Sequence, residues 1–205
     1  MRLLMFSALT IGIVHALAPD HWLPFVMLGR AQKWTQWRLT LSTVLAGLGH
    51  VTSSLFIGGL GVLLGMAAER VNLWESTRGN VASLLLIGFG LAYMVWGLKN
   101  YGKKHSHAMQ HAQTVSYWTL FALIVFGPCE PLIPLLFAGY SLGWSAVVSV
   151  FLLFGLSTVG MMLLQVHLAF YGLSLFNAHR FEHASDIIAG GVITATGFGI
   201  RVFGI

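Results

Sequence analysis

Six apolar stretches, each near the length that crosses a bilayer, constrain the fold of this chain more than any single motif. They cover roughly residues 3–18, 39–67, 81–98, 115–138, 142–175 and 187–205. A helix of about 20 apolar residues spans the hydrocarbon core. Of the 205 residues, 57% are hydrophobic and 8% are charged, which is far from the average of soluble proteins. The sequence therefore predicts an all-α integral membrane protein with six transmembrane helices.

The basic residues lie mostly between these stretches and predict the orientation. Segments 29–38 and 99–114, together with Arg180, place seven basic residues on one side against four on the other. The positive-inside rule puts the richer side in the cytoplasm, so we expect a protein of the cell (inner) membrane with both termini outward. Anionic lipid headgroups account for the net charge of +5, and no nucleic-acid partner is expected.

Residues 15–24, His-Ala-Leu-Ala-Pro-Asp-His-Trp-Leu-Pro, place polar groups at the end of the first apolar stretch. A charge at bilayer depth costs roughly 2.5–3.5 kcal/mol, so we treat this segment as a functional site. Pro19 and Pro24 lack an N–H, and we expect them to break the helix and to free the carbonyls of His15 and Asp20. Broken helices of this kind carry the ion sites of many transporters.

The same N-terminal run has features of a signal peptide, with Arg2 at its start and Ala16-Leu17-Ala18 as a cleavage site. Pro19 directly after this site suits cleavage poorly. We therefore expect the segment to be retained.

Three pairs of matched segments predict an internal duplication at an offset of 107 to 110 residues. The pairs are Gly47–Leu55 with Gly155–Leu163, Asp20-x-x-x-Pro24 with Glu130-x-x-x-Pro134, and Gly90–Gly97 with Gly197–Gly204. Each unit holds three helices, and an odd number makes the second copy enter from the opposite face. We expect two inverted repeats, 1–98 and 115–205, joined by a His-rich cytoplasmic loop, 99–114. Asp20 and Glu130 should then approach each other near the pseudo-two-fold axis.

The matching element of the second half, residues 126–136, also combines prolines with ionisable groups. We expect its three prolines, Pro128, Pro131 and Pro134, to break the helix. Cys129 is the single cysteine, which excludes an internal disulfide, and it is either a metal ligand or a small buried hydrophobe. A buried carboxylate such as Glu130 must be paired, protonated or bound to an ion.

The histidines near the first break suggest a ligand set. With the helix broken at Pro19, the side chains of His15, Asp20 and His21 can converge on one ion, and His50 is the expected fourth ligand. Imidazoles with one carboxylate suit nickel, cobalt, zinc or copper better than magnesium or calcium.

Other histidines carry weaker indications. His105, His107 and His111 form a short tract that can hold a transition metal loosely, or that is simply a polar loop. His167 is better explained as a hydrogen-bonded residue of the core than as part of the site.

The spacing His15-x-x-x-x-Asp20-His21 resembles the H-x-x-x-x-D-H motif of the nickel/cobalt permeases and their urease-accessory relatives. This resemblance implies that these three residues recognise metal. The permeases typically have Asp-Pro-Asp-His where this chain has Ala-Pro-Asp-His, and they have more helices.

The Gly-Pro-Cys-x-Pro segment at 127–131, with two three-helix repeats, resembles the thiol-redox membrane proteins of cytochrome c biogenesis. These thiol-redox proteins are similar to the nickel/cobalt permeases, and both belong to the same wider transporter group. That family requires a second reactive cysteine where this chain has Pro19-Asp20.

These patterns leave three functions to weigh. The first is a carrier that moves a divalent transition-metal ion by alternating access. Nickel or cobalt is favoured as the ion, and zinc is a further candidate. We expect protons as a coupling ion and no organic cofactor. The alternative is a transmembrane thiol-redox conduit or an exporter of a sulfur-containing anion. The third is a membrane metalloenzyme that activates water. The sequence contains no Walker-type phosphate loop, so we expect no nucleotide hydrolysis by this chain.

Overall fold

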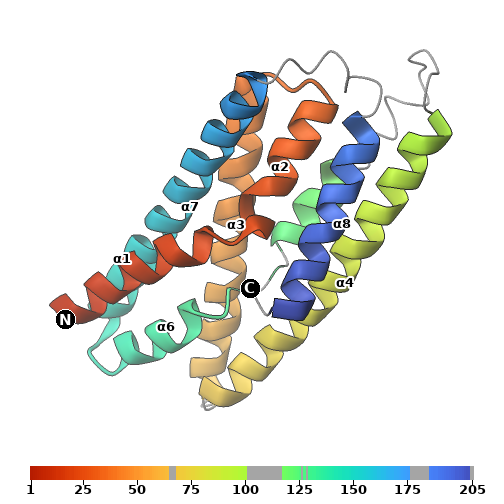
Figure 1. Cartoon of the computed structure of the whole chain (residues 1–205). Helices are drawn as coiled ribbons and strands as arrows, with labels where there is room; N and C mark the ends of the chain where they lie inside the picture. Colours follow the sequence, from red (N-terminus) through yellow and green to blue (C-terminus); the bar gives the residue numbers. More distant parts are fainter. Residues whose placement is uncertain (65–67, 101–116, 126, 128, 176–184, 204–205) are drawn as a thin grey trace.

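A computed structural model of the chain describes residues 1–64, 68–100, 117–125, 127, 129–175 and 185–203. Within these ranges the chain is helical and has no β-strand, which confirms the all-α prediction (Figure 1). The helices are α1 (Arg2–Ala16), α2 (Pro19–Ala31), α3 (Gln36–Leu63), α4 (Ala68–Asn100), α6 (Leu132–Tyr140), α7 (Trp144–Leu175) and α8 (Ser185–Phe203). Residues 117–125 form a further helical segment.

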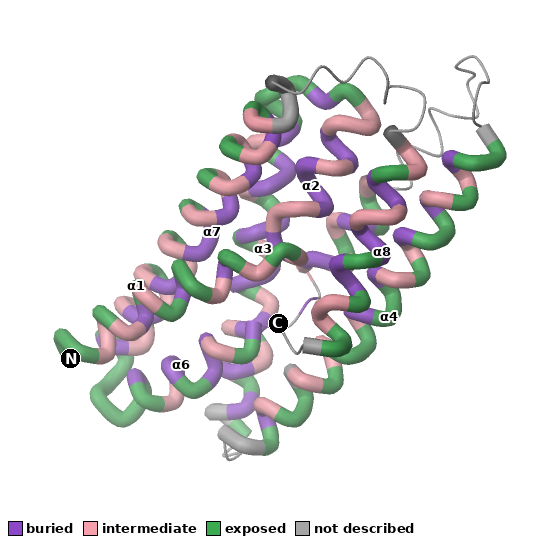
Figure 2. The backbone as a smooth tube through the Cα atoms, in the orientation of Figure 1, coloured by how far each residue is buried: buried purple, intermediate pink, exposed green. Residues whose placement is uncertain are grey.

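Three helices of the described part are long and apolar enough to cross a membrane, in the segments Gln36–Gly61, Arg70–Lys99 and Trp144–Gly172. The bent pair α1 and α2 adds a fourth if it is counted as one span. Exposed residues line the outer sides of the helices (Figure 2), and many of them are large and apolar, such as Phe6, Phe56 and Leu156. Such a surface matches lipid as the solvent. The chain is therefore a membrane protein, while the count of six spans stays a prediction.

The first break separates α1 from α2, which are bent by 44° relative to each other. Pro19 is the first residue of α2, where its fixed φ favours the helix and its missing N–H costs no hydrogen bond. The carbonyl of His15 accepts a hydrogen bond from the Ala18 N–H at 3.2 Å. The expectation that Pro19 frees this carbonyl is therefore wrong, because a tight turn supplies another donor.

Pro24 does not break its helix, contrary to the expectation. It lies inside α2, which continues to Ala31. It lacks only the N–H that would have bonded the carbonyl of Asp20, and the helix tolerates this single loss.

The second break interrupts the predicted stretch 115–138. The helical segment 117–125 ends before it, and α6 begins at Leu132, with Pro131 as the N-cap residue. Pro128 lies outside the described residues. Pro134 falls in the first turn of α6, where its N–H is not needed, and the carbonyl of Glu130 accepts from the Ile133 N–H at 3.3 Å instead. The expectation that Pro134 breaks the helix and frees this carbonyl is wrong for that reason.

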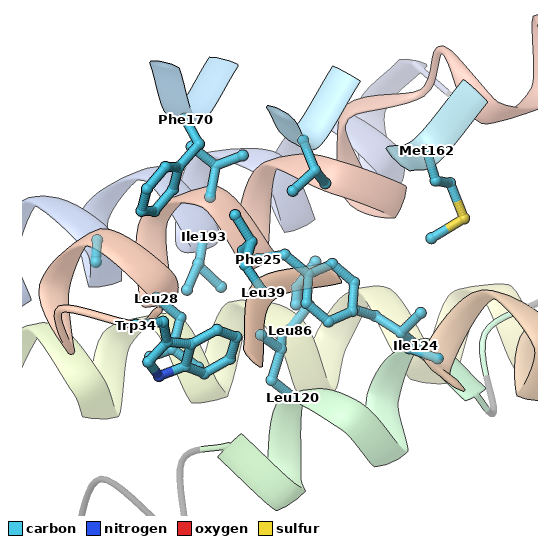
Figure 3. Close-up of a cluster of buried hydrophobic side chains, with 14 of the residues drawn as sticks. Phe25, Leu28, Trp34, Leu39, Leu86, Leu120, Ile124, Met162, Phe170 and Ile193 are labelled. Atoms are coloured by element: carbon cyan, nitrogen blue, oxygen red, sulfur yellow. The ribbon is translucent and has the colours of Figure 1, made fainter. Parts of the chain in front are cut away.

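The helices α4 and α8 pack closely against each other, as do α1 and α7 (Figure 1). A Cβ on Gly190 of α8 would lie 2.7 Å from both the Gly90 carbonyl oxygen and the Met94 Cα of α4, so only glycine allows this approach. Buried apolar side chains from α2, α4, segment 117–125 and α8 meet in one cluster (Figure 3), which includes Phe25, Leu86, Leu120 and Ile193. Both broken segments are thus anchored to a packed core.

The two halves share an order of elements, with a broken helix followed by two longer ones. The inverted orientation of the halves and the boundaries 1–98, 99–114 and 115–205 stay predictions.

Candidate metal centre

Among the described residues, three imidazole rings meet where α1, α2 and α3 approach one another. His15 lies in the last turn of α1, His21 in the first turn of α2, and His50 within α3. The Nε2 atoms are 3.1 Å apart for His15 and His21, 3.3 Å for His21 and His50, and 3.4 Å for His15 and His50. A point about 1.9 Å from all three atoms lies in their plane, and metal–nitrogen bonds of about 2.0–2.1 Å put an ion slightly out of that plane. The spacing therefore suits a transition-metal ion.

The outer nitrogens of two of these rings are held by acceptors. His21 Nδ1 donates to Asp20 Oδ1 at 2.9 Å, and His50 Nδ1 donates to the carbonyl of Ile124 at 3.0 Å. Carbonyls and ionised carboxylates only accept, so both Nδ1 atoms carry the hydrogen. In the neutral rings, both Nε2 atoms then present lone pairs to each other across 3.3 Å. Metal-binding histidines have this arrangement, with the outer N–H bonded to a carboxylate or a backbone carbonyl.

Asp20 is positioned by the start of α2. It lies in the first helical turn, where a negative charge complements the helix dipole, and its side chain is 26% exposed. Its Oδ1 contacts the outer nitrogen of His21, while the inner nitrogen of that ring faces His15 and His50. Asp20, which the sequence predicts as a direct ligand, therefore contacts the outer side of the His21 ring and orients that ring.

Three carbonyls of the second break are satisfied by side chains of α3 and α4. Besides the His50–Ile124 hydrogen bond, Ser53 Oγ donates to the Val125 carbonyl at 2.8 Å, and Arg78 Nη2 donates to the Gly127 carbonyl at 3.0 Å. Backbone groups at membrane depth need such partners. The bond from His50 fixes both its ring and the end of segment 117–125.

We did not predict the contributions of Ser53 and Arg78 from the sequence. A signal was present, because prolines four residues after Ile124 and Gly127 remove the helical donors of those carbonyls. Polar residues in neighbouring apolar stretches are then candidate donors. Arg78 precedes the apolar stretch 81–98, and this position favours a loop residue over a donor of the site.

The second break also brings Cys129 to the histidines. Its side chain is 0% exposed, and its Sγ lies 3.5 Å from His15 Nε2. The ligand atoms of His15, His50 and Cys129 all lie within 4.8 Å of one another. A thiol from the second half thus joins imidazoles from the first.

A cavity of about 340 Å³ adjoins this group. Its lining includes the three histidines, both carboxylates of the predicted pair, and polar side chains of α4 and α8, namely His15, His21, His50, Asp20, Glu130, Ser76, Asn80, Ser83 and Arg201. Asp20 and Glu130 thus line one cavity, although Glu130 is exposed. The centre therefore borders a space with room for water and for a passing ion.

The remaining predicted residues lie elsewhere. His167 of α7 donates from Nδ1 to the Leu163 carbonyl at 2.9 Å, and its Nε2 is 3.0 Å from Thr40 Oγ1, so its ring is engaged outside the cavity. The tract of His105, His107 and His111 lies outside the described residues.

Comparison with known proteins finds a partial relative. The chain is 31% identical over 114 residues to the urease accessory protein UreH of Bacillus sp. (strain TB-90). The match covers 54% of this chain and 48% of that protein, so it spans about half the length of the curated relative. No protein-family model and no solved structure matches the chain. The match supports the urease-accessory proteins among the families that the sequence resembles.

Proposed function

We propose that this chain is a membrane transporter of a divalent transition-metal ion, with nickel or cobalt as the favoured cargo, and not an enzyme. One observation carries the proposal: His21 and His50 direct their Nε2 atoms at each other across 3.3 Å while both Nδ1 atoms act as donors. Two facing lone pairs repel unless a cation lies between them. His15 adds a third nitrogen at 3.1 and 3.4 Å from the other two.

A proton between two of the nitrogens is the competing interpretation. It would satisfy one pair of imidazoles, and the role of the third nitrogen would then depend on the tautomer of His15. A metal ion uses all three, and imidazole is a preferred ligand of nickel, cobalt, zinc and copper.

The position of the centre favours transport over storage. The ligands come from both sides of a broken helix, the second broken segment lies against them, and a cavity adjoins them. Discontinuous helices around a central site are the usual architecture of alternating-access carriers, in which one half rocks against the other. Asp20 and Glu130, which line the same cavity, are the proposed groups for exchanging protons against metal.

The choice of nickel or cobalt rests on the relatives. The H-x-x-x-x-D-H motif resembles the nickel/cobalt permeases, and the partial match is to a protein named for its accessory role to urease. A cell-membrane location with both termini outward completes the proposal.

Uptake of cobalt or nickel into proteoliposomes tests this function. The wild-type chain should give saturable uptake, and His15→Ala, His21→Ala and His50→Ala should each abolish it. His167→Ala is the matched control, because it removes a membrane-embedded histidine that is engaged by Thr40 and Leu163 away from the cavity. Normal saturable uptake by the three centre variants would refute the proposal.

A further inference from the structure

We infer that Cys129 is a further ligand of the ion, which makes the centre a mixed site of imidazole nitrogens and one thiolate. The inference rests on the proposed function, since it assigns a further ligand and a preferred metal class to the same site. Its consequence is that the centre suits cobalt(II) and zinc(II) better than nickel(II).

The first support is distance. Metal–nitrogen bonds of about 2.0–2.1 Å and metal–sulfur bonds of about 2.3 Å in a tetrahedron place neighbouring nitrogen and sulfur atoms about 3.5 Å apart. Cys129 Sγ lies 3.5 Å from His15 Nε2, and the ligand atoms of His15, His50 and Cys129 lie within 4.8 Å of one another. The Nε2 atoms are 3.1 to 3.4 Å apart, near the roughly 3.3 Å expected for nitrogens on one tetrahedral ion.

The second support is charge. His21, His50 and Cys129 are 4%, 3% and 0% exposed, so these side chains would hold an ion in a largely buried position beside the cavity. Three neutral imidazoles would leave both positive charges of a divalent ion uncompensated, and buried charges must be paired. A thiolate at Cys129 and the carboxylate of Asp20 behind His21 together balance the ion.

The third support is the lack of a competing anionic ligand in the part of the chain that the structure describes. Two carboxylates line the cavity there. Asp20 is directed at the outer nitrogen of His21, and Glu130 is exposed. The thiol is the anionic donor that the fold buries beside the imidazoles.

The fold also fixes the position of this thiol. The Cys129 carbonyl accepts from the Leu132 N–H at 3.1 Å at the start of α6, and the side chain packs in a cluster with Ala8, Val51 and Phe154. A ligand held by packing and a helix start needs little reorganisation to bind.

The ligand set decides the metal class. Tetrahedral sites that combine sulfur and nitrogen suit zinc and its close substitute cobalt(II), whereas nickel(II) prefers square-planar or tetragonal sites of nitrogen and oxygen. The thiol proton is displaced when sulfur binds the ion and leaves through the adjoining cavity to water.

Absorption spectroscopy of the purified full chain with added cobalt chloride tests the assignment. Because Cys129 is the single cysteine, a thiolate-to-cobalt charge-transfer band can come from no other thiol. We expect this band in the wild-type protein at one cobalt per chain. Cys129→Ser should still bind cobalt through the histidines, but without the band, at least about tenfold more weakly, and with a smaller preference for cobalt over nickel.

The outcomes distinguish the role of Cys129 from the proposed function. Wild-type protein that binds cobalt through its histidines without a charge-transfer band overturns the role of Cys129 and leaves the proposed function standing. Folded wild-type protein that binds no cobalt overturns both. Circular dichroism of Cys129→Ser and Cys129→Ala verifies folding, and the presence or absence of the band in the wild-type protein is decisive without either variant.

Discussion

Replacement of Asp20 separates the contributions of charge and orientation at the metal centre. Its Oδ1 accepts the charge-assisted hydrogen bond from His21 Nδ1 at 2.9 Å. Asp20→Asn removes the charge but keeps an amide oxygen that can accept the same hydrogen bond. Asp20→Ala removes both and leaves the imidazole free to turn.

The expected loss of metal affinity follows from the hydrogen bond that Asp20 accepts from the outer nitrogen of His21. Removal of such a partner typically weakens metal binding about 10- to 100-fold, which is roughly 1.4–2.7 kcal/mol. We expect Asp20→Asn near the lower end of this range, because the ring orientation survives, and Asp20→Ala near the upper end.

Competition titration against a chelator, with the purified protein and cobalt, measures these affinities. Asp186→Asn is the matched control, since Asp186 Oδ1 accepts from the Tyr93 hydroxyl at 2.8 Å outside the cavity. Its affinity should equal that of the wild type. Equal affinities for wild type, Asp20→Asn and Asp20→Ala would refute the role assigned to Asp20.

Two further predictions concern proton competition and helix packing. Cobalt affinity should be full near neutral pH and fall as the pH is lowered, because each imidazole must lose its proton to bind metal; a titration series that gives a pH-independent affinity would contradict ligation by histidine. Gly190→Ala should lower the free energy of unfolding by about 1–3 kcal/mol, because the added Cβ would meet the Gly90 carbonyl and the Met94 backbone of α4. Gly199→Ala on the same helix should leave the free energy of unfolding unchanged, because a Cβ there meets nothing within 4 Å. Thermal unfolding in detergent compares the two variants, and equal stabilities would contradict the close packing of α8 on α4.

Much of the fold was predictable, because the apolar stretches dictate helices and lipid as the solvent. Stretches 39–67 and 142–175 correspond closely to α3 and α7. The roles of individual prolines were less predictable, since the effect of a proline depends on its place in the helix. Pro19 and Pro134 fall in first turns, where a missing N–H costs nothing, and Pro24 lies within a helix that continues past it.

The site was predictable in composition and less so in geometry. The spacing of His15, Asp20 and His21 indicated that these side chains lie close together. It could not tell that Asp20 faces the outer nitrogen of His21. Such roles depend on side-chain direction. The bond from Arg78 to the Gly127 carbonyl joins residues 49 positions apart in the sequence, and no local pattern encodes that contact.

X-ray absorption spectroscopy of the full chain loaded with one equivalent of cobalt reports directly on the ligands of the ion. We predict an ion surrounded by imidazole nitrogens from His15, His21 and His50 at about 2.0–2.1 Å, with the imidazole signal reduced in His50→Ala and unchanged in His167→Ala. A shell of oxygen atoms alone, or an imidazole signal that persists unchanged in His50→Ala, would contradict a metal centre built from these three histidines.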